Sequence, residues 1–200
     1  MRALLGLSAV FLTLLCSQPV FSKPCPTWSG FQCPPGFREG GGMGCIKFVK
    51  LNGTEKTPEE VLDVCERQEG VKEPNHSLPE IIWNKHQNSY ISRLFAQQVG
   101  NRRLGFVIGL YIPEDREWSK ENFDWYGKST WTGGYYFSGP HYRNWASSEP
   151  DNYHKNSPER LVVVYNSRDY SEPGVWADES VEYVHHSAQY IACGAREQEC

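Results

Sequence analysis

Two segments in the first half of the chain carry the hydrophobic period of an amphipathic helix. The first opens with Thr57-Pro58-Glu59-Glu60 and continues towards Gly70. A Thr N-cap, Pro at the first helical position and Glu three residues after the cap predict a helix start. The second opens at Asn84 and continues to Gly100. Apolar residues recur at helical spacing in both: Val61, Leu62, Val64 and Cys65 in the first, and Tyr90, Ile91, Leu94, Phe95 and Val99 in the second.

Strands are predicted between and after these helices. Ser77-Leu78-Pro79-Glu80 imitates another helix cap, but the β-branched and aromatic run Ile81-Ile82-Trp83 favours a short strand. After Gly105 the helical period disappears, and short apolar runs bounded by Gly, Pro, Asn and Ser are typical of strands. These runs are Phe106 to Leu110, Leu161 to Tyr165, Val175-Trp176 and Gln189 to Cys193.

The segment between residues 110 and 161 is far longer than the usual connection of about 4–6 residues. Such a loop is functional or disordered, and its many Trp and Tyr residues favour order. A glycine cluster, Gly40-Gly41-Gly42-Met43-Gly44, lies between Cys33 and Cys45 and not between a strand and a helix. This position favours a tight hairpin over a phosphate-binding loop.

Composition and charge exclude several function classes. A chain of 200 residues with 39% hydrophobic and 14% aromatic residues can bury a core, so wholesale disorder is excluded. The formal net charge is −4, and no basic run exceeds the pair Arg102-Arg103. Nucleic-acid binding and an anionic membrane surface both need a basic patch that this pattern lacks.

The N-terminus predicts secretion. Residues 1–22 have the pattern of a signal peptide, with Arg2, an apolar stretch from Leu4 to Leu15, and Val20-Phe21-Ser22 as the cleavage site. The mature chain, residues 23–200, is therefore expected to be an extracellular protein. No later segment has the eighteen or so apolar residues of a membrane span.

Cysteine usage agrees with an oxidising compartment. Of the seven cysteines, Cys16 lies in the predicted signal peptide, which leaves an even set of six. Zinc binding is the competing reading, but no pair has the spacing of a zinc knuckle, so disulfides are favoured. Asn52-Gly53-Thr54 and Asn75-His76-Ser77 are predicted glycosylation acceptors on the surface.

An ordered series of short motifs resembles the C-type lectin-like domain of secreted animal proteins. The resemblance covers nearly all of the mature chain and implies an α+β fold with two helices, short antiparallel strands and a long loop region. Cys33 and Cys45 match the optional N-terminal hairpin, here residues 25–45, and Cys65 falls in the first helix. The other matching pieces are Val107-Ile108-Gly109-Leu110, Tyr142-Arg143-Asn144-Trp145, Glu149-Pro150-Asp151, Trp176-Ala177-Asp178 and Tyr190-Ile191-Ala192-Cys193.

The resemblance implies a disulfide pattern. Cys33 is expected to pair with Cys45 and Cys65 with Cys193, and Cys25 and Cys200 then join the ends of the mature chain. A further bridge of the family is missing, because Leu161 and Val181 stand where its cysteines would be. Apolar packing is expected to replace it.

The resemblance also implies a calcium ion that binds a sugar directly. Its expected ligands are Glu149, Asp151, Glu159 and Asp178, and calcium suits such carboxylates because it takes six to eight oxygens in flexible geometry. In the family the peptide bond before the proline, here Pro150, is cis. The alternative reading of Glu-Pro-Asp is an ordinary turn, and the place of the motif in the series favours the calcium reading.

Two departures from the family pattern affect this prediction. Ala177 stands where the family usually has Asn, so one amide ligand is missing and calcium is expected to bind more weakly. Glu149 is typical of mannose-type sites and Asp151 of galactose-type sites, so the sugar specificity stays open. Compared with the usual spacing in the family, two extra residues separate Asp151 from Glu159, so Glu159 departs most from the family pattern. The expected sugar-binding residues are Glu149, Asp151, Tyr153 and Asp178, with Tyr153 as the stacking group.

Other chemistry is less favoured. His154, His185 and His186 suggest a metal, but adjacent histidines on a strand point to opposite faces and are ordinary surface residues. Trp125, Trp131 and Trp145 are either sugar-stacking groups or core aromatics of the loops. No nucleophile motif is present. Three hypotheses remain in falling order: a calcium-dependent binder of glycans or glycoproteins, a calcium-independent domain that binds a protein or another ligand, and a carboxylate glycosidase. We therefore expect a binding protein and not an enzyme.

Overall fold

The computed structural model describes residues 33–40, 44–68, 77–100, 104–126, 141–154, 156–166 and 174–195. Several predictions fall outside these residues. They are the signal peptide of residues 1–22, the Cys25–Cys200 disulfide, the glycosylation acceptor Asn75 and the stacking candidate Trp131. None of the helices within the described residues has the length and apolar composition needed to cross a bilayer.

The second predicted helix, α2 (Lys85–Val99), forms with both of its expected end signals. The Asn84 side chain accepts a hydrogen bond from Gln87 N at 3.0 Å, which satisfies one of the free N–H groups of the first turn. Gly100 ends the helix in the left-handed conformation with φ 69°. The apolar period predicted from the sequence buries Ile91, Leu94 and Phe95.

The first predicted helix is shorter than its sequence pattern. Helix α1 (Pro58–Leu62) begins at the Thr57 N-cap as expected, but ends at Leu62. After Leu62 the N–H groups of Val64, Cys65 and Glu66 bond carbonyls three residues back, which is the tighter 3₁₀ pattern. Residues 63–67 therefore form a series of turns. Val64 and Cys65 are still buried, although they lie outside the helix.

The strands form an eight-stranded sheet in the order β1-β2-β8-β4-β6-β7, with β3 beside β8 and β5 beside β4. Pairing is antiparallel except between β4 and β8, where Val107 faces Ile191 in parallel. The strands are β1 (Arg38–Glu39), β2 (Cys45–Lys50), β3 (Leu78–Pro79), β4 (Gly105–Tyr111), β5 (Asp124–Trp125), β6 (Leu161–Tyr165), β7 (Val175–Glu179) and β8 (Tyr190–Ala195). The β1–β2 pair is the hairpin predicted between Cys33 and Cys45.

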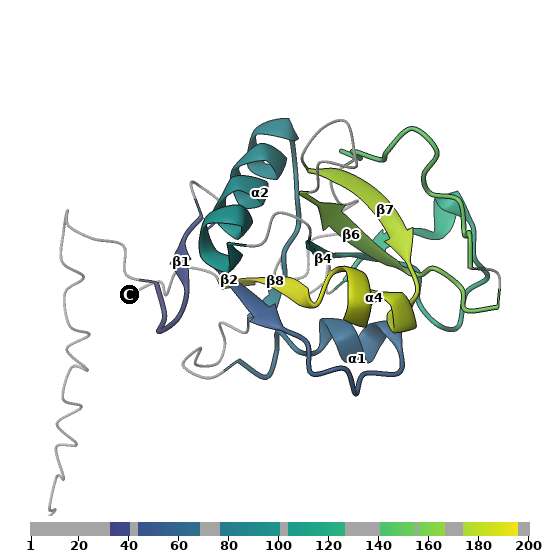
Figure 1. Ribbon diagram of the computed structural model, residues 1–200, viewed down its shortest axis with the longest axis horizontal. Helices are drawn as coiled ribbons and strands as arrows, with labels where there is room; N and C mark the ends of the chain where they lie inside the picture. The colour runs from purple at the N-terminus through teal and green to yellow at the C-terminus, as the bar shows by residue number, and fades with distance from the viewer. Residues whose placement is uncertain are drawn as a thin grey trace, which may run out of the picture. The chain divides into compact units, whose positions relative to one another are not determined.

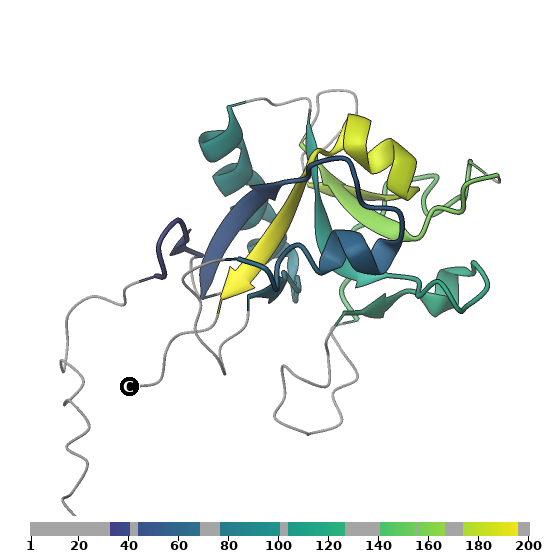
Figure 2. The ribbon, with the colours of Figure 1, turned by 90° about the horizontal axis from the view of Figure 1, so that it is seen from below.

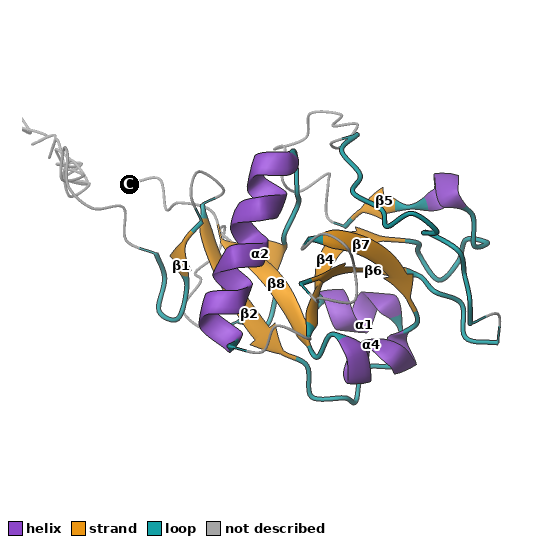
Figure 3. Cartoon of the chain, turned by 45° about the horizontal axis from the view of Figure 1, so that its top comes forward, coloured by secondary structure: helices purple, strands orange, loops and turns teal. Residues whose placement is uncertain are grey.

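Both faces of the sheet are covered, because alternate residues of its central strands enter two apolar clusters. In β6, Val162 and Val164 join the cluster with α2, whereas Leu161, Val163 and Tyr165 join the cluster with α1 and α4 (Val181–Ser187). Figures 1 and 2 show α2 on one side of the sheet and α1 and α4 on the other. Figure 3 shows a group of described loops beyond β4, β6 and β7, at the end of the sheet away from β1, besides the shorter loops elsewhere.

The structure corrects two sequence predictions of local structure. The strand predicted at Ile81-Ile82-Trp83 lies earlier, at Leu78–Pro79, because these two residues pair with β8. Glu80 extends the contact, since its N–H donates to Ala192 O at 2.8 Å. Helix α4 was not predicted, and it carries His185 and His186. His185 and His186 therefore lie on a helix, and the prediction that they lie on a strand is wrong.

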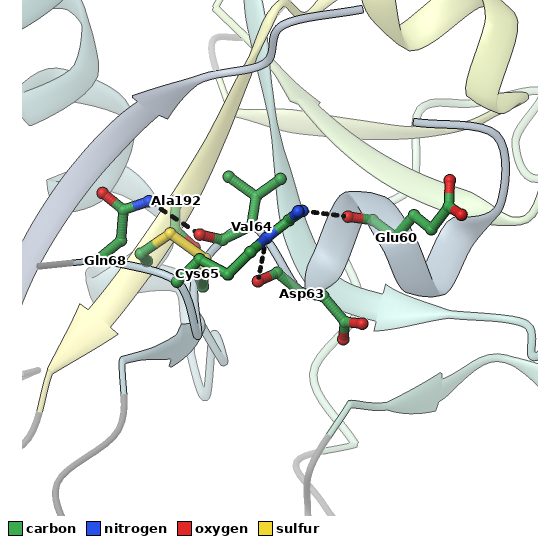
Figure 4. The surroundings of a disulfide bond; sticks show 8 residues. Glu60, Asp63, Val64, Cys65, Gln68 and Ala192 are labelled. Atoms are coloured by element: carbon green, nitrogen blue, oxygen red, sulfur yellow. Dashed lines mark hydrogen bonds between the residues drawn. A yellow bond between two sulfur atoms is a disulfide. The ribbon is translucent and has the colours of Figure 1, made fainter. Parts of the chain in front are cut away.

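Two disulfides cross-link the described residues in the pairs that the resemblance implies, Cys33–Cys45 and Cys65–Cys193. Figure 4 shows the second, which ties the turns after α1 to β8. Gln68 Nε2 donates to Val64 O at 2.8 Å and so satisfies a carbonyl at the end of these turns. Where the family has a further bridge, Leu161 is fully buried and Val181 packs against the same cluster.

The long disulfide is expected to contribute more stability than the short one. Cys65 and Cys193 are 128 positions apart and Cys33 and Cys45 only 12, so loop-closure entropy predicts about 5 and about 3 kcal/mol respectively. Urea unfolding of the two double Cys→Ala variants measures the difference. Equal losses of free energy would contradict the entropic explanation.

Candidate metal centre

Three carboxylates meet where the loop after Trp145 lies against β7. Trp176 N donates to Asn144 O at 2.8 Å and Ala146 N donates to Trp176 O at 2.9 Å, so the loop is tied to the strand. Glu149 and Asp151 flank Pro150, whose peptide bond is cis as the resemblance implies. The ligand oxygens of Glu149, Asp151 and Asp178 lie within 4.8 Å of one another. The structure therefore brings together three of the four predicted calcium ligands, which we call the carboxylate cluster.

Asp178 holds the loop in place. Its side chain is almost fully buried, with 3% of its surface exposed. Asp178 Oδ1 accepts from Asp151 N at 3.0 Å, and Oδ2 accepts from Asn152 N at 3.1 Å and from Trp118 Nε1 at 3.2 Å. A buried carboxylate needs such donors. Trp118 was not singled out in the sequence, because it lies sixty positions from Asp178 and only the fold brings the two together.

Glu149 shows the electrostatic cost of the carboxylate cluster. The pKa of Glu149 is raised from its ordinary value of 4.5 to about 8, and burial is the largest cause. A hydrogen bond to Asp178 and the charges of Asp151, Asp178 and Glu159 contribute to the same rise. The cluster therefore favours either a proton on Glu149 or a cation among its oxygens.

The fourth predicted ligand, Glu159, lies in a second group. His154 Nδ1 is 2.6 Å from Glu159 Oε1, and the ligand atoms of His154, Glu159 and Glu179 lie within 4.8 Å of one another. We call these three residues the histidine cluster. The link after Asp151 folds back at Asn152, whose φ is 52° and whose Oδ1 accepts from Glu159 N at 3.1 Å. This turn directs Glu159 to His154, while its charge still acts on Glu149.

The histidine cluster has its own supporting contacts. The imidazole of His154 stacks on the ring of Tyr183, with centroids 3.7 Å apart and an interplanar angle of 22°. The Tyr165 hydroxyl donates to Glu179 Oε1. Burial is the main cause that raises the pKa of both Glu159 and Glu179. Sequence reasoning missed Glu179, although a carboxylate directly after the Trp-Ala-Asp motif was a signal.

Other predicted positions behave differently. Ala177 is buried in the apolar cluster that contains α1 and α4, so it supplies no oxygen to either group of carboxylates. Tyr153 has 77% of its surface exposed beside the carboxylate cluster, as a stacking residue requires. Trp125 is buried and Trp145 packs on Phe123 and Trp176, so both belong to the core of the loops. His185 contacts Glu55, away from both clusters, with its Nε2 3.2 Å from Glu55 O.

Comparison with known proteins identifies the fold of this chain. No protein-family model and no curated protein sequence matches the chain. Among solved structures, the C-type lectin CEL-I from Cucumaria echinata is similar with a TM-score of 0.58 and 22% identity, over 84% of this chain and 99% of that one. The chain has the C-type lectin-like fold.

Two other structures support the same conclusion. Human lithostathine matches with a TM-score of 0.55 and 16% identity, over 88% of this chain and all of that one (100%). The carbohydrate-recognition domain of the mouse scavenger receptor C-type lectin matches with a TM-score of 0.52 and 19% identity, over 84% of this chain and 98% of that one. In each case the match extends over nearly the whole of the solved chain.

Without a bound cation, Glu149 should make the folded protein less stable as the pH rises. Its pKa is raised to about 8, so above about pH 4.5 the unfolded chain loses this proton before the folded chain does. Stability should fall until about pH 8, with a slope below about 1.4 kcal/mol per pH unit because water screens this half-buried group. Urea unfolding against pH in a chelator measures the slope, and Glu149→Gln should reduce it.

Glu80 supplies the matched control for this measurement. It is buried away from the two clusters, and burial also raises its pKa to about 8. Glu80→Gln should therefore also reduce the pH dependence of stability. The contribution of Glu80 should be the same with and without calcium. Identical slopes for the wild type and Glu149→Gln would show that ionisation of Glu149 does not destabilise the folded protein.

Proposed function

We propose that this chain is a secreted carbohydrate-binding protein that recognises sugar hydroxyls through calcium at the carboxylate cluster. The observation that carries the proposal is the convergence of Glu149, Asp151 and Asp178 to within 4.8 Å. The similarity to C-type lectins shows the fold alone and is consistent with this function. We propose binding without catalysis.

The donor set of the carboxylate cluster fits calcium. Calcium is a hard ion that takes six to eight oxygens at about 2.3–2.6 Å, and three carboxylates supply at most six. Asp178 already uses three of its roughly four lone-pair sites for N–H donors, so it has about one left for an ion. The remaining positions are then open to water or to two hydroxyls of a sugar.

The neighbouring residues fit a sugar at such an ion. Carboxylate oxygens of Glu149 and Asp151 can accept hydrogen bonds from the hydroxyls that coordinate calcium. The exposed ring of Tyr153 offers an apolar face for the sugar ring. Ala177 contributes no amide donor, so every hydroxyl must donate to a carboxylate. The affinity for the sugar should therefore depend more on the calcium ion than on hydrogen bonds that the protein donates to the sugar.

Several features support an extracellular location. The signal-peptide pattern of residues 1–22 predicts export. The Cys33–Cys45 and Cys65–Cys193 disulfides are typical of oxidising compartments. Asn52 lies on the surface, where its side chain accepts from Thr54 N and Thr54 Oγ1, so this predicted glycosylation acceptor is accessible. Asn75 stays a prediction from the sequence.

A glycan array read with and without calcium tests the proposal. The chain should bind a subset of glycans with calcium and lose them in a chelator. Glu149→Gln and Asp151→Asn should each weaken calcium binding by about 10-fold or more, as measured by calorimetry, because each removes one ligand charge. Asp115→Asn, an exposed acid outside both clusters, is the matched control and should change nothing.

Two outcomes would contradict this proposal. Glycan binding that persists in the chelator would move recognition away from the carboxylate cluster. Absence of both calcium heat and glycan signals would favour a calcium-independent lectin-like domain that binds a protein or another ligand.

Acid should release the sugar. Metal ligands must be deprotonated, so protons and calcium compete for Glu149, whose pKa is raised before calcium binds. Calcium affinity, and with it retention on a sugar column, should fall between about pH 7.5 and about pH 5 at constant calcium. Retention that is unchanged by acid but abolished by chelator would mean that calcium binds without displacing a proton.

A further inference from the structure

The histidine cluster lies next to the carboxylate cluster but has different chemistry. It contains His154, Glu159 and Glu179, whose ligand atoms lie within 4.8 Å of one another. We propose that these three residues form a second metal site, which binds a transition-metal ion of the zinc type. This inference does not depend on the proposed calcium site or on sugar binding.

An unpaired buried oxygen is the observation that points to a ligand. Glu159 has 2% of its surface exposed, and its Oε2 is fully buried without any hydrogen-bond partner. A buried carboxylate oxygen without a donor is unfavourable, because it loses its hydrogen bonds to water and gains none in the protein. Such a cost is removed if the oxygen binds a cation.

The ion pair with His154 does not account for the whole cluster. His154 Nδ1 satisfies only Oε1 of Glu159, at 2.6 Å. The pair also does not involve Glu179, which the Tyr165 hydroxyl holds with a ligand atom within 4.8 Å of those of the other two residues. A divalent cation between the three groups accounts for both features.

Contacts around the cluster hold each ligand in position. The stack on Tyr183 fixes the plane of the His154 ring, and the Tyr165 hydroxyl fixes one oxygen of Glu179. The Asn152 side chain holds the backbone of Glu159 through the 3.1 Å hydrogen bond to its N–H. Partners of this kind orient the ligands of metal sites in proteins.

The ligand types select the metal. An imidazole nitrogen with two carboxylates suits zinc and its neighbours, at about 2.0–2.2 Å, whereas calcium prefers oxygens alone. Zinc binding would replace the His154–Glu159 hydrogen bond by one metal bond to each group, with the imidazole neutral. His154 has 26% of its side-chain surface open, so a fourth position at the metal can face solvent and take water.

Calorimetry with Zn²⁺ on the chelator-treated full chain tests the site. About one equivalent should bind, both with and without saturating calcium. His154→Gln and Glu179→Gln should each lower the Zn²⁺ affinity by at least about 10-fold. His186→Gln, an exposed histidine on α4, is the matched control and should leave it unchanged. Asp151→Asn should weaken calcium binding but not Zn²⁺ binding, which separates this proposal from the calcium site.

A second measurement decides the outcome even if a variant does not fold. Imidazole NMR of the wild-type chain should show Zn²⁺-dependent shifts in one histidine, identified as His154 by its NOE to the Tyr183 ring. No Zn²⁺ binding by the wild type would overturn the proposal. It would equally be overturned by unchanged affinity in folded His154→Gln, or by shifts at His185 instead.

Discussion

The hydrogen bonds to the buried carboxylate of Asp178 are the interactions on which both candidate metal sites depend. Asp178 stands on β7, the strand that ends the sheet, and accepts hydrogen bonds from two backbone N–H groups of the loop and from the indole of Trp118. One side chain thus joins three segments that are remote in sequence. The positions of Glu149 and Asp151 follow from this anchor, because their loop is held at Asp151 and Asn152. If Asp178 binds the proposed calcium ion, the same anchor should keep the empty and occupied forms of the loop similar.

The elements that the sequence predicted well are those whose burial is periodic over their full length. Helix α2 and strand β6 are examples, since one buries a single stripe and the other buries every residue on alternating faces. Helix α4 was missed because among its residues only Val184 is fully buried, which gives no period to detect. The short strand β3 was misplaced because its position depends on pairing with β8, a contact more than one hundred positions away.

The same distinction separates the parts of the site that could be predicted from those that could not. Glu149, Asp151 and Asp178 lie in short motifs whose place in the chain order identified them. The direction of Glu159 depends on the turn at Asn152, and a residue with φ 52° leaves no clear mark in a sequence. Glu179, Tyr165 and Tyr183 became part of the site only through the antiparallel pairing of β6 with β7 and the packing of α4.

The charge balance of this region is compatible with the two proposed cation sites lying side by side. The charges of Glu149, Asp151, Asp178, Glu159 and Glu179 act on one another in an unbroken series, and burial raises the pKa of three of them. His154 is the single basic group among these described residues of the two clusters, so it can offset at most one negative charge. Protons offset the rest only at a cost in stability near neutral pH. A calcium ion bound in the carboxylate cluster would leave the charge of Glu159 and Glu179 uncompensated, and the proposed second divalent ion held through His154 would neutralise it. Occupation of the two sites should therefore be mutually compatible, because each ion relieves a different part of the same negative charge.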